Sequence, residues 1–227
     1  MKKTIRFFVG GPAFHPTSEQ AQAISTWLGP RYNYEIVDGS EAFDSLDAVD
    51  LLVVMGLHWR GMEAEWAGQL AYKPLNVAQK ENWRRYVASG RPVLAFHGGI
   101  ASYDDWPEFS HLLGFCWDWK LTSHLCVETY EVNMGPEPHA ITKDIPTFKA
   151  IDEIYVNIQV VPDLEIHVHA QTAFHGARFP LIISGYGGRI TGAGKTLYLA
   201  NGHDMRTFQA PEIRLIWQNS VKWLLET

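Results

Sequence analysis

The sequence predicts an α/β fold in which helices cover both faces of a doubly wound, mostly parallel sheet. In the first hundred residues, short apolar runs alternate with amphipathic segments, as expected for successive strand–helix units. The runs at 51–55 and 92–96 are apolar throughout, which is typical of parallel strands buried on both faces. The second half contains closely spaced strand-like runs, which predict an antiparallel extension of the sheet.

The first half contains four predicted strands and two predicted helices. Thr17 and Gln20 have the spacing of a capping box at the start of a helix over 17–28. Asn76 can cap a second helix, which is expected over 77–88. The four strands are expected at 5–9, 34–37, 51–55 and 92–96.

The second half predicts further strands and one long C-terminal helix. Pro211 suits the first turn of that helix, and an apolar stripe follows it. The strands are expected at 127–134, 151–161, 164–172, 181–184 and 196–200. We find no internal repeat, low-complexity tract or linker, so the sequence predicts one domain over residues 1–227.

Composition excludes several classes of protein. The chain has 227 residues, 46% of them hydrophobic, and a net charge of −6. Nucleic-acid binding needs a basic surface, which this balance does not provide. No apolar stretch reaches the length of a membrane span, and no export signal is recognisable. With only two cysteines and no metal-binding cysteine spacing, we expect a cytoplasmic protein with reduced thiols.

Histidines and glycines follow three of the predicted parallel strands. His15 follows the first strand, His58 and Trp59 follow the third, and His97 and Gly98 follow the fourth. Because ligands bind beyond the carboxyl ends of such strands, we expect these residues to share one edge of the sheet. The nine Trp, nine Tyr and eleven Phe favour a carbohydrate cleft, since exposed aromatic rings stack on sugars. Such platforms could come from Trp59, Trp106, Trp117 and Trp119, although we expect at least half of these four to be core.

The turn at 95–99 is similar to a nucleophile elbow, in which a strand runs into a tight, glycine-flanked turn. Class I glutamine amidotransferases place a cysteine at this elbow, whereas this chain has His97 there. Cys116 and Cys126 do not follow a buried strand in this way. A cysteine-dependent amidotransferase is therefore not expected, although the glycine N–H groups could hold an oxyanion or a sugar hydroxyl.

An ordered set of short motifs covers nearly the whole chain. It comprises Asp50 before an apolar run, Leu-Ala-Phe-His at 94–97, His-Ala-Ile-Thr at 139–142, Asp-Glu-Ile-Tyr at 152–155, and Gly-Ala-Gly-Lys-Thr-Leu-Tyr at 192–198 before Asn-Gly-His at 201–203. This set resembles the trehalose-utilisation (ThuA-like) family. Three positions depart from the family pattern: Ala95 replaces a usual glycine, Ala140 replaces a usual proline, and Leu125 follows the histidine-bearing segment at 123–124.

The resemblance implies a flavodoxin-like, class I glutamine amidotransferase-like fold. It also implies a role in the catabolism of trehalose or a related disaccharide, acting on 3-keto derivatives. Such chemistry needs a base beside the carbonyl and a group that stabilises the enolate. We predict that His97, Glu153 and His203 are catalytic. The residues expected to bind the sugar are His15, His58, Trp59, Gly98, His124 and His139.

Several properties stay open from the sequence. A divalent metal held by His and Glu could polarise the carbonyl, but the sequence does not assign a cofactor. The partner is expected to be a small-molecule sugar, with no nucleic acid and no membrane, and a homo-oligomer is left open. The alternative function is a non-catalytic sugar-binding or regulatory module on the same fold.

One further motif, His167-Val168-His169, lies in an alternating run. Alternation places Glu165, His167, His169 and Gln171 on one face of a strand. Two histidines at this spacing can share a metal, but we favour a solvated polar face.

Overall fold

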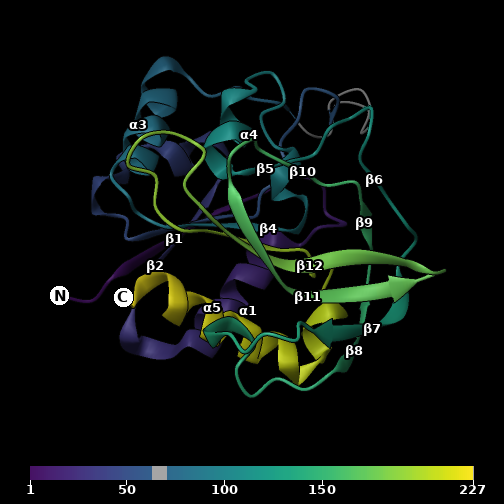
Figure 1. Cartoon of the computed structure of the whole chain (residues 1–227). Coiled ribbons are helices and arrows are strands. Elements are labelled where there is room, and N and C mark those ends of the chain that lie inside the picture. The colour runs from purple at the N-terminus through teal and green to yellow at the C-terminus, as the bar shows by residue number, and fades with distance from the viewer. Residues whose placement is uncertain (63–70, 227) are drawn as a thin grey trace.

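The computed structural model describes residues 1–62 and 71–226, and its centre is a nine-stranded mixed sheet (Figure 1). The strands lie in the order β2-β1-β3-β4-β13-β12-β11-β7-β8. Their bounds in that order are Asn33–Asp38, Thr4–Val9, Leu51–Val54, Val93–Phe96, Thr196–Leu199, Ala177–Tyr186, Glu165–Phe174, Glu128–Met134 and Phe148–Asp152. Two small antiparallel pairs join β5 (Phe115–Cys116) to β10 (Gln159–Val160) and β6 (Ser123–His124) to β9 (Tyr155–Val156).

The first five strands of this order are all parallel, as the apolar runs predict. β3, β4 and β13 are buried at every residue, because helices cover both of their faces. The chain moves from β1 outward to β2 and then back past β1 to β3, so β1 lies where the strand order reverses. Ligand sites of open α/β sheets lie at such a reversal, beyond the carboxyl ends of the strands.

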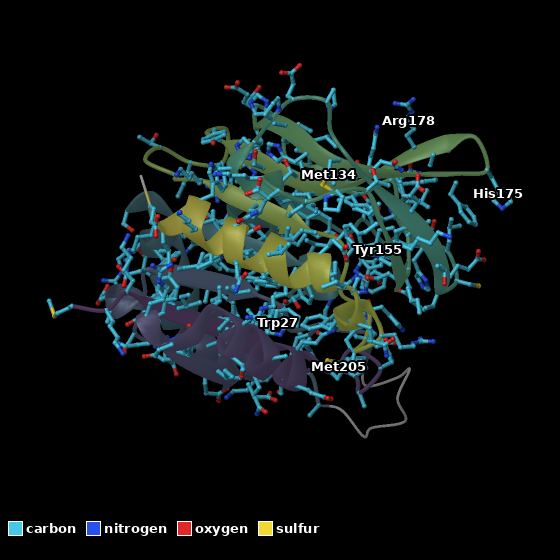
Figure 2. All side chains as sticks on the ribbon, turned by 90° about the horizontal axis from the view of Figure 1, so that it is seen from below. Trp27, Met134, Tyr155, His175, Arg178 and Met205 are labelled. Atoms are coloured by element: carbon cyan, nitrogen blue, oxygen red, sulfur yellow. The ribbon has the colours of Figure 1, made fainter. Side chains whose placement is uncertain are left out.

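The remaining strands are antiparallel, which confirms the predicted extension. β11 and β12 form a long hairpin with His175 at its outer end, away from the rest of the molecule (Figure 2). The short helical turn Ala140–Thr142 between β7 and β8 packs on the C-terminal helix α5 (Pro211–Leu225). The edge of the sheet therefore folds back toward the helical layer.

Helices lie on both faces of the sheet. α5 packs with α1 (Thr17–Leu28) on one face, while α3 (Val77–Ala88) and α4 (Glu108–Leu113) pack together on the other (Figure 1). Large buried rings fill both layers, with Trp83 and Tyr86 on α3 and Trp217 on α5. No helix among the described residues is long and apolar enough to cross a membrane.

The predicted helix starts differ in outcome. Asn76 caps α3 in a complete capping box with Gln79, as expected. The capping role expected for Thr17 is wrong, because Pro16 occupies the N-cap position and no side chain caps α1. The Thr17 hydroxyl instead accepts the N–H of Gly10 at 2.8 Å and so ties the loop after β1 to the helix.

Two strand predictions are corrected. The run expected over 151–161 is broken into the end of β8, β9 and β10. It breaks after Asp152, whose side chain accepts the next N–H and so competes with the strand ladder. In β11, a register shift between Val168 and Ala170 ends the regular alternation and turns His169 inward, where it is buried.

Candidate functional site

Four side chains from four separate loops converge beyond the parallel strands. His15 follows β1, His97 follows β4, Glu153 follows β8 and His203 follows β13. Each offers one ligand-type atom, and these atoms all lie within 4.8 Å of one another. We call these four residues the histidine–glutamate cluster, and its donor atoms are of the kind that could hold a metal ion.

Glu153 is the centre of the cluster. Its Oε2 atom lies 3.3 Å from His203 Nδ1 and 3.5 Å from His97 Nε2. Its Oε1 atom lies 3.2 Å from Nδ1 of His124, which β6 brings in by pairing with β9. His15 joins through its Nε2 atom, 3.2 Å from His203 Nδ1.

His97 is held rigidly at the turn after β4. The pairing of Phe96 with Leu199 places it beside Ala200, whose carbonyl accepts a hydrogen bond from His97 Nδ1 at 2.6 Å. Since a carbonyl can only accept, Nδ1 carries a proton, and in the neutral ring Nε2 has a lone pair that faces Glu153. The residue has a left-handed φ of 42°, a conformation that costs about 1–3 kcal/mol in a non-glycine residue. The side chain therefore has a fixed direction into the cluster.

Asp152 organises the loops that carry Glu153 and His203. Its carboxylate is fully buried and accepts the N–H of Glu153 at 2.8 Å and the N–H of His203 at 3.1 Å. It also accepts the Thr207 hydroxyl at 2.9 Å. Burial raises the pKa of Asp152, and a nearby histidine and these hydrogen bonds partly offset the rise. No role was predicted for Asp152 from the sequence. The feature that could have indicated one is its place beside Glu153 in the Asp-Glu-Ile-Tyr motif.

The cluster separates charge among its members. Burial alone would raise the pKa of Glu153, but the facing rings of His203 and His97 hold it well below its usual range. Burial would lower the pKa of His203, yet the facing carboxylate of Glu153 raises it overall. Burial, with the neighbouring His97 and His203, lowers the pKa of His15 well below its usual value. Glu153 is therefore an anion, and His15 is a neutral imidazole.

A cavity of about 320 Å³ opens beside the cluster. Its aromatic lining includes Trp59 and Trp119, whose rings stack with centroids 5.8 Å apart. The Tyr155 ring lies against the His97 ring at 4.5 Å between centroids, and Tyr155 lies in the interior of the molecule (Figure 2). The lining residues are Phe14, His15, Leu57, Trp59, Gly98, Ala101, Trp117, Trp119, His124, Glu153, Tyr155 and His203.

Most of the predicted sugar-binding residues lie at this cavity, and two do not. His15, Trp59, Gly98 and His124 line it. His58 does not line it; it is buried, with its ring near those of Phe8 and Tyr103. The reason is that His58 turns inward toward β1, whereas its neighbour Trp59 turns toward the cavity.

His139 lies apart from the cluster. Its ring stacks on that of His169 at 4.0 Å and packs against Trp223 of α5. His169 Nε2 in turn contacts the Ser184 hydroxyl at 2.7 Å. The turn between β7 and β8 carries His139 to the helical side of the sheet, so it does not line the cavity.

The four tryptophans divide unevenly between cavity and core. Trp59, Trp117 and Trp119 line the cavity, which is more than the half expected, while Trp106 belongs to the core. Phe14 and Tyr155 also line the cavity, although neither was predicted as a site residue. Phe14 adjoins His15 in the sequence, and Tyr155 is the last residue of the Asp-Glu-Ile-Tyr motif that contains Glu153.

Comparison with known proteins agrees with this architecture. The sequence model of the family described as ThuA, trehalose utilisation, matches residues 13–224. No curated protein matches the chain in sequence. A ThuA-like protein from Parabacteroides merdae has a similar structure, with a TM-score of 0.75 and 13% identity over 100% of this chain and 91% of that one.

Two further solved structures share the fold. A ThuA-like protein from Bacteroides uniformis gives a TM-score of 0.70 and 18% identity over 98% of this chain and 91% of that one. A glutamine amidotransferase from Thermotoga maritima gives a TM-score of 0.55 and 8% identity, and each chain is covered to 100%. The predicted amidotransferase-like fold is therefore confirmed.

Proposed function

Because this chain belongs to the trehalose-utilisation (ThuA) family, we propose that it acts in carbohydrate catabolism, on a disaccharide or its 3-keto derivative. The reaction would take place at His97, Glu153 and His203. The observation that carries this proposal is the convergence of these three side chains, with His15, beside one aromatic-walled cavity. The family description supplies the class of substrate, and the cluster supplies the chemistry.

The lining of the cavity suits a sugar. The flat faces of Trp59, Trp119 and Tyr155 can stack on the C–H faces of a pyranose ring. The polar atoms of His124 and Glu153 lie at one side and can bind hydroxyls. A volume of about 320 Å³ lies near the lower end of the ~300–1,000 Å³ that is usual for small-molecule pockets, which favours a small ligand.

The electrostatics assign the base of the proposed reaction. A 3-keto sugar reacts by losing the proton beside its carbonyl, while positive charge or hydrogen bonds stabilise the enolate oxygen. Glu153 is a poor base, because neighbouring histidines hold its pKa far below its usual range. His124 is better placed to act as the base. Its Nδ1 atom faces the Glu153 carboxylate, which leaves Nε2 as the basic nitrogen. Its side chain is 51% exposed, so a substrate can reach it.

The reaction can then be written as a balanced elimination. The C2 proton moves to His124 Nε2, and the electron pair of the C2–H bond forms the enolate with its oxygen on the cluster. The enolate re-forms the C3 carbonyl and a C1–C2 double bond as the C1–O bond breaks, and the departing oxygen takes up the proton that His124 Nε2 received. In this scheme His15 and His203, which line the cavity, hold the enolate oxygen. The buried His97 supports Glu153 from the next shell of contacts, and Glu153 orients His124.

Turnover of a 3-keto-disaccharide tests the proposal. We expect His97→Ala, Glu153→Gln and His124→Ala each to lower kcat by at least about 100-fold, the size of a general acid–base contribution. The control is Glu165→Gln, which removes an exposed carboxylate that lies 3.5 Å from a histidine, His167, outside the cavity. Sugar binding without turnover in the unaltered protein would instead favour a non-catalytic binding module. Failure to bind any sugar would contradict both.

A further inference from the structure

We propose that His15, His97, His203 and Glu153 together bind one divalent transition-metal ion of the Zn²⁺ type. The proposal rests on the proposed function only for the identity of the substrate. The metal site itself is argued from the cluster, where four ligand atoms from four loops lie within 4.8 Å of one another.

The spacing of the four atoms fits a single ion. Metal–nitrogen and metal–oxygen bonds of about 2.0–2.1 Å in a tetrahedral site place neighbouring ligand atoms about 3.3 Å apart. The observed separations are 3.2 Å for His15 Nε2 to His203 Nδ1, and 3.3 Å for His203 Nδ1 to Glu153 Oε2. His97 Nε2 lies 3.5 Å from the same carboxylate oxygen. These three distances match three of the six edges of a tetrahedron around one central ion, and the other three edges are at most 4.8 Å long.

Hydrogen bonding alone does not satisfy these atoms. The Ala200 carbonyl fixes a proton on Nδ1 of His97, so in the neutral ring Nε2 is an acceptor that faces a second acceptor, the Glu153 carboxylate. His97 is 2% exposed, and its Nε2 has no hydrogen-bond partner. A buried acceptor without a donor costs about 1–3 kcal/mol. A cation between His97 and Glu153 removes this cost, because both atoms then donate lone pairs to it.

His203 leads to the same conclusion. Its Nδ1 faces both His15 Nε2 and Glu153 Oε2, and one ring nitrogen carries at most one hydrogen. Its other nitrogen, Nε2, faces the Asp204 carboxylate at 4.0 Å, which favours a hydrogen on that side. The lone pair of Nδ1 is then directed into the cluster, as a metal ligand requires.

The outer contacts are those of a prepared metal site. Metal-binding histidines usually donate their second ring N–H to a carbonyl or carboxylate, as His97 does to Ala200. The Asp152 carboxylate fixes the backbone at Glu153 and His203 through both N–H groups. The positions of these ligands are thus set by the folded backbone.

The donor set also selects the kind of metal. Three imidazoles and one carboxylate suit Zn²⁺, Co²⁺, Ni²⁺, Mn²⁺ or Fe²⁺, whereas Ca²⁺ and Mg²⁺ prefer oxygen ligands. His15, Glu153 and His203 line the cavity, so an additional coordination position faces the bound sugar. A metal there would polarise a sugar carbonyl as a Lewis acid. Glu153 would bind the ion through Oε2, while its Oε1 atom contacts His124.

Metal binding to the purified, tag-free chain tests this inference. We expect about one equivalent of metal per chain by elemental analysis. After removal with a chelator, added Co²⁺ should give the visible absorption of a four-coordinate site, and Zn²⁺ should displace it. Removing a residue that only contacts a metal ligand typically weakens metal affinity by about 10–100-fold. Because His97→Ala and Glu153→Gln each remove a proposed ligand, we expect a larger loss of Zn²⁺ affinity from each. His139→Ala is the matched control, because this histidine lies outside the cluster and should leave affinity unchanged.

Circular dichroism of each variant separates loss of a ligand from loss of the fold, and Glu153→Gln keeps the side-chain shape if His97→Ala does not fold. Folded protein with far less than one equivalent of metal and no Co²⁺ spectrum would overturn the inference. So would binding that both variants leave intact. Stoichiometric metal without any sugar turnover would refute the proposed function and leave the metal site standing. Sugar turnover by a protein that binds no metal would refute the metal site and leave the proposed function standing.

Discussion

The backbone N–H of His203 donates to the Oδ1 atom of Asp152 at 3.1 Å, across 51 residues of sequence. The same oxygen accepts the N–H of Glu153 at 2.8 Å. One fully buried carboxylate thereby fixes the loop after β8 and the loop after β13 relative to each other. The relative position of Glu153 and His203 therefore depends on a residue that does not line the cavity.

Replacing Asp152 should harm stability and the site together. Asp152→Ala leaves two buried N–H groups without an acceptor, and we expect a loss of at least about 1–3 kcal/mol in the free energy of unfolding. Asp152→Asn retains an oxygen acceptor for those N–H groups and should lose less. Urea denaturation measures both variants. Unchanged stability of Asp152→Ala would show that the two loops are held in another way.

Adding a side chain at Gly98 should weaken the binding of metal and sugar. A Cβ atom there would lie 3.0 Å from the Cε1 and Nδ1 atoms of His15 and 3.4 Å from the Tyr155 hydroxyl. Gly98→Ala should therefore displace the His15 ring and weaken metal and sugar binding, with little change in Tm. Titration calorimetry measures the affinity, and unchanged affinity for both would exclude a role of His15 in the site.

Trp119 should contribute to sugar binding and little to stability. It lies at the cavity, is 50% exposed and stacks on Trp59. Trp119→Ala should weaken the binding of a disaccharide by about 0.5–1.5 kcal/mol, the usual value of a ring contact beyond burial. Leu121→Ala is the control, because Leu121 is similarly exposed but does not line the cavity. Equal effects of the two variants would contradict a stacking role.

Stability should fall in mild acid because of His169. Burial, with the neighbouring His139 and His167, lowers its pKa from 6.5 to about 4. Between these two values the unfolded chain binds a proton that the folded chain does not, so folding weakens as pH falls through this window. A shift of this size corresponds to about 3 kcal/mol of stability, at about 1.4 kcal/mol for each pKa unit.

Urea denaturation from pH 7 to pH 4 measures this loss. His169→Asn keeps a donor for Ser184 and should give a shallower fall of stability with pH than the unaltered chain. His175→Asn is the control, because it replaces an exposed histidine at the outer end of the β11–β12 hairpin (Figure 2). An identical slope in His169→Asn would contradict the assignment.

Local patterns determined the parallel half of the fold. The continuous apolar runs of β3 and β4 predict their burial, and Asn76 with Gln79 predicts the start of α3. They also place His15 and His97 at one edge of the sheet, because parallel strands present their carboxyl ends on the same side. These features depend on neighbours a few residues apart, which the sequence displays directly.

Other details depended on contacts between distant residues. Alternation could not predict that a register shift in β11 turns His169 inward, because the shift accommodates both neighbouring strands. Thr17 has the residue type of a helix cap, yet the loop after β1 uses its hydroxyl. His139 carries a family motif but lies on the helical side of the sheet, where its ring packs on Trp223.

The sequence by itself determined the fold class, the family and the residue types of the site, because periodicity, caps and motif order are local properties. Only the tertiary structure decided that Glu153, from an antiparallel strand at the sheet edge, reaches the histidines that follow β1, β4 and β13. The physical reason is that the edge folds back until Asp152 meets the backbone of His203. No short-range pattern encodes the direction in which a sheet curls, since that direction follows from packing of the whole core.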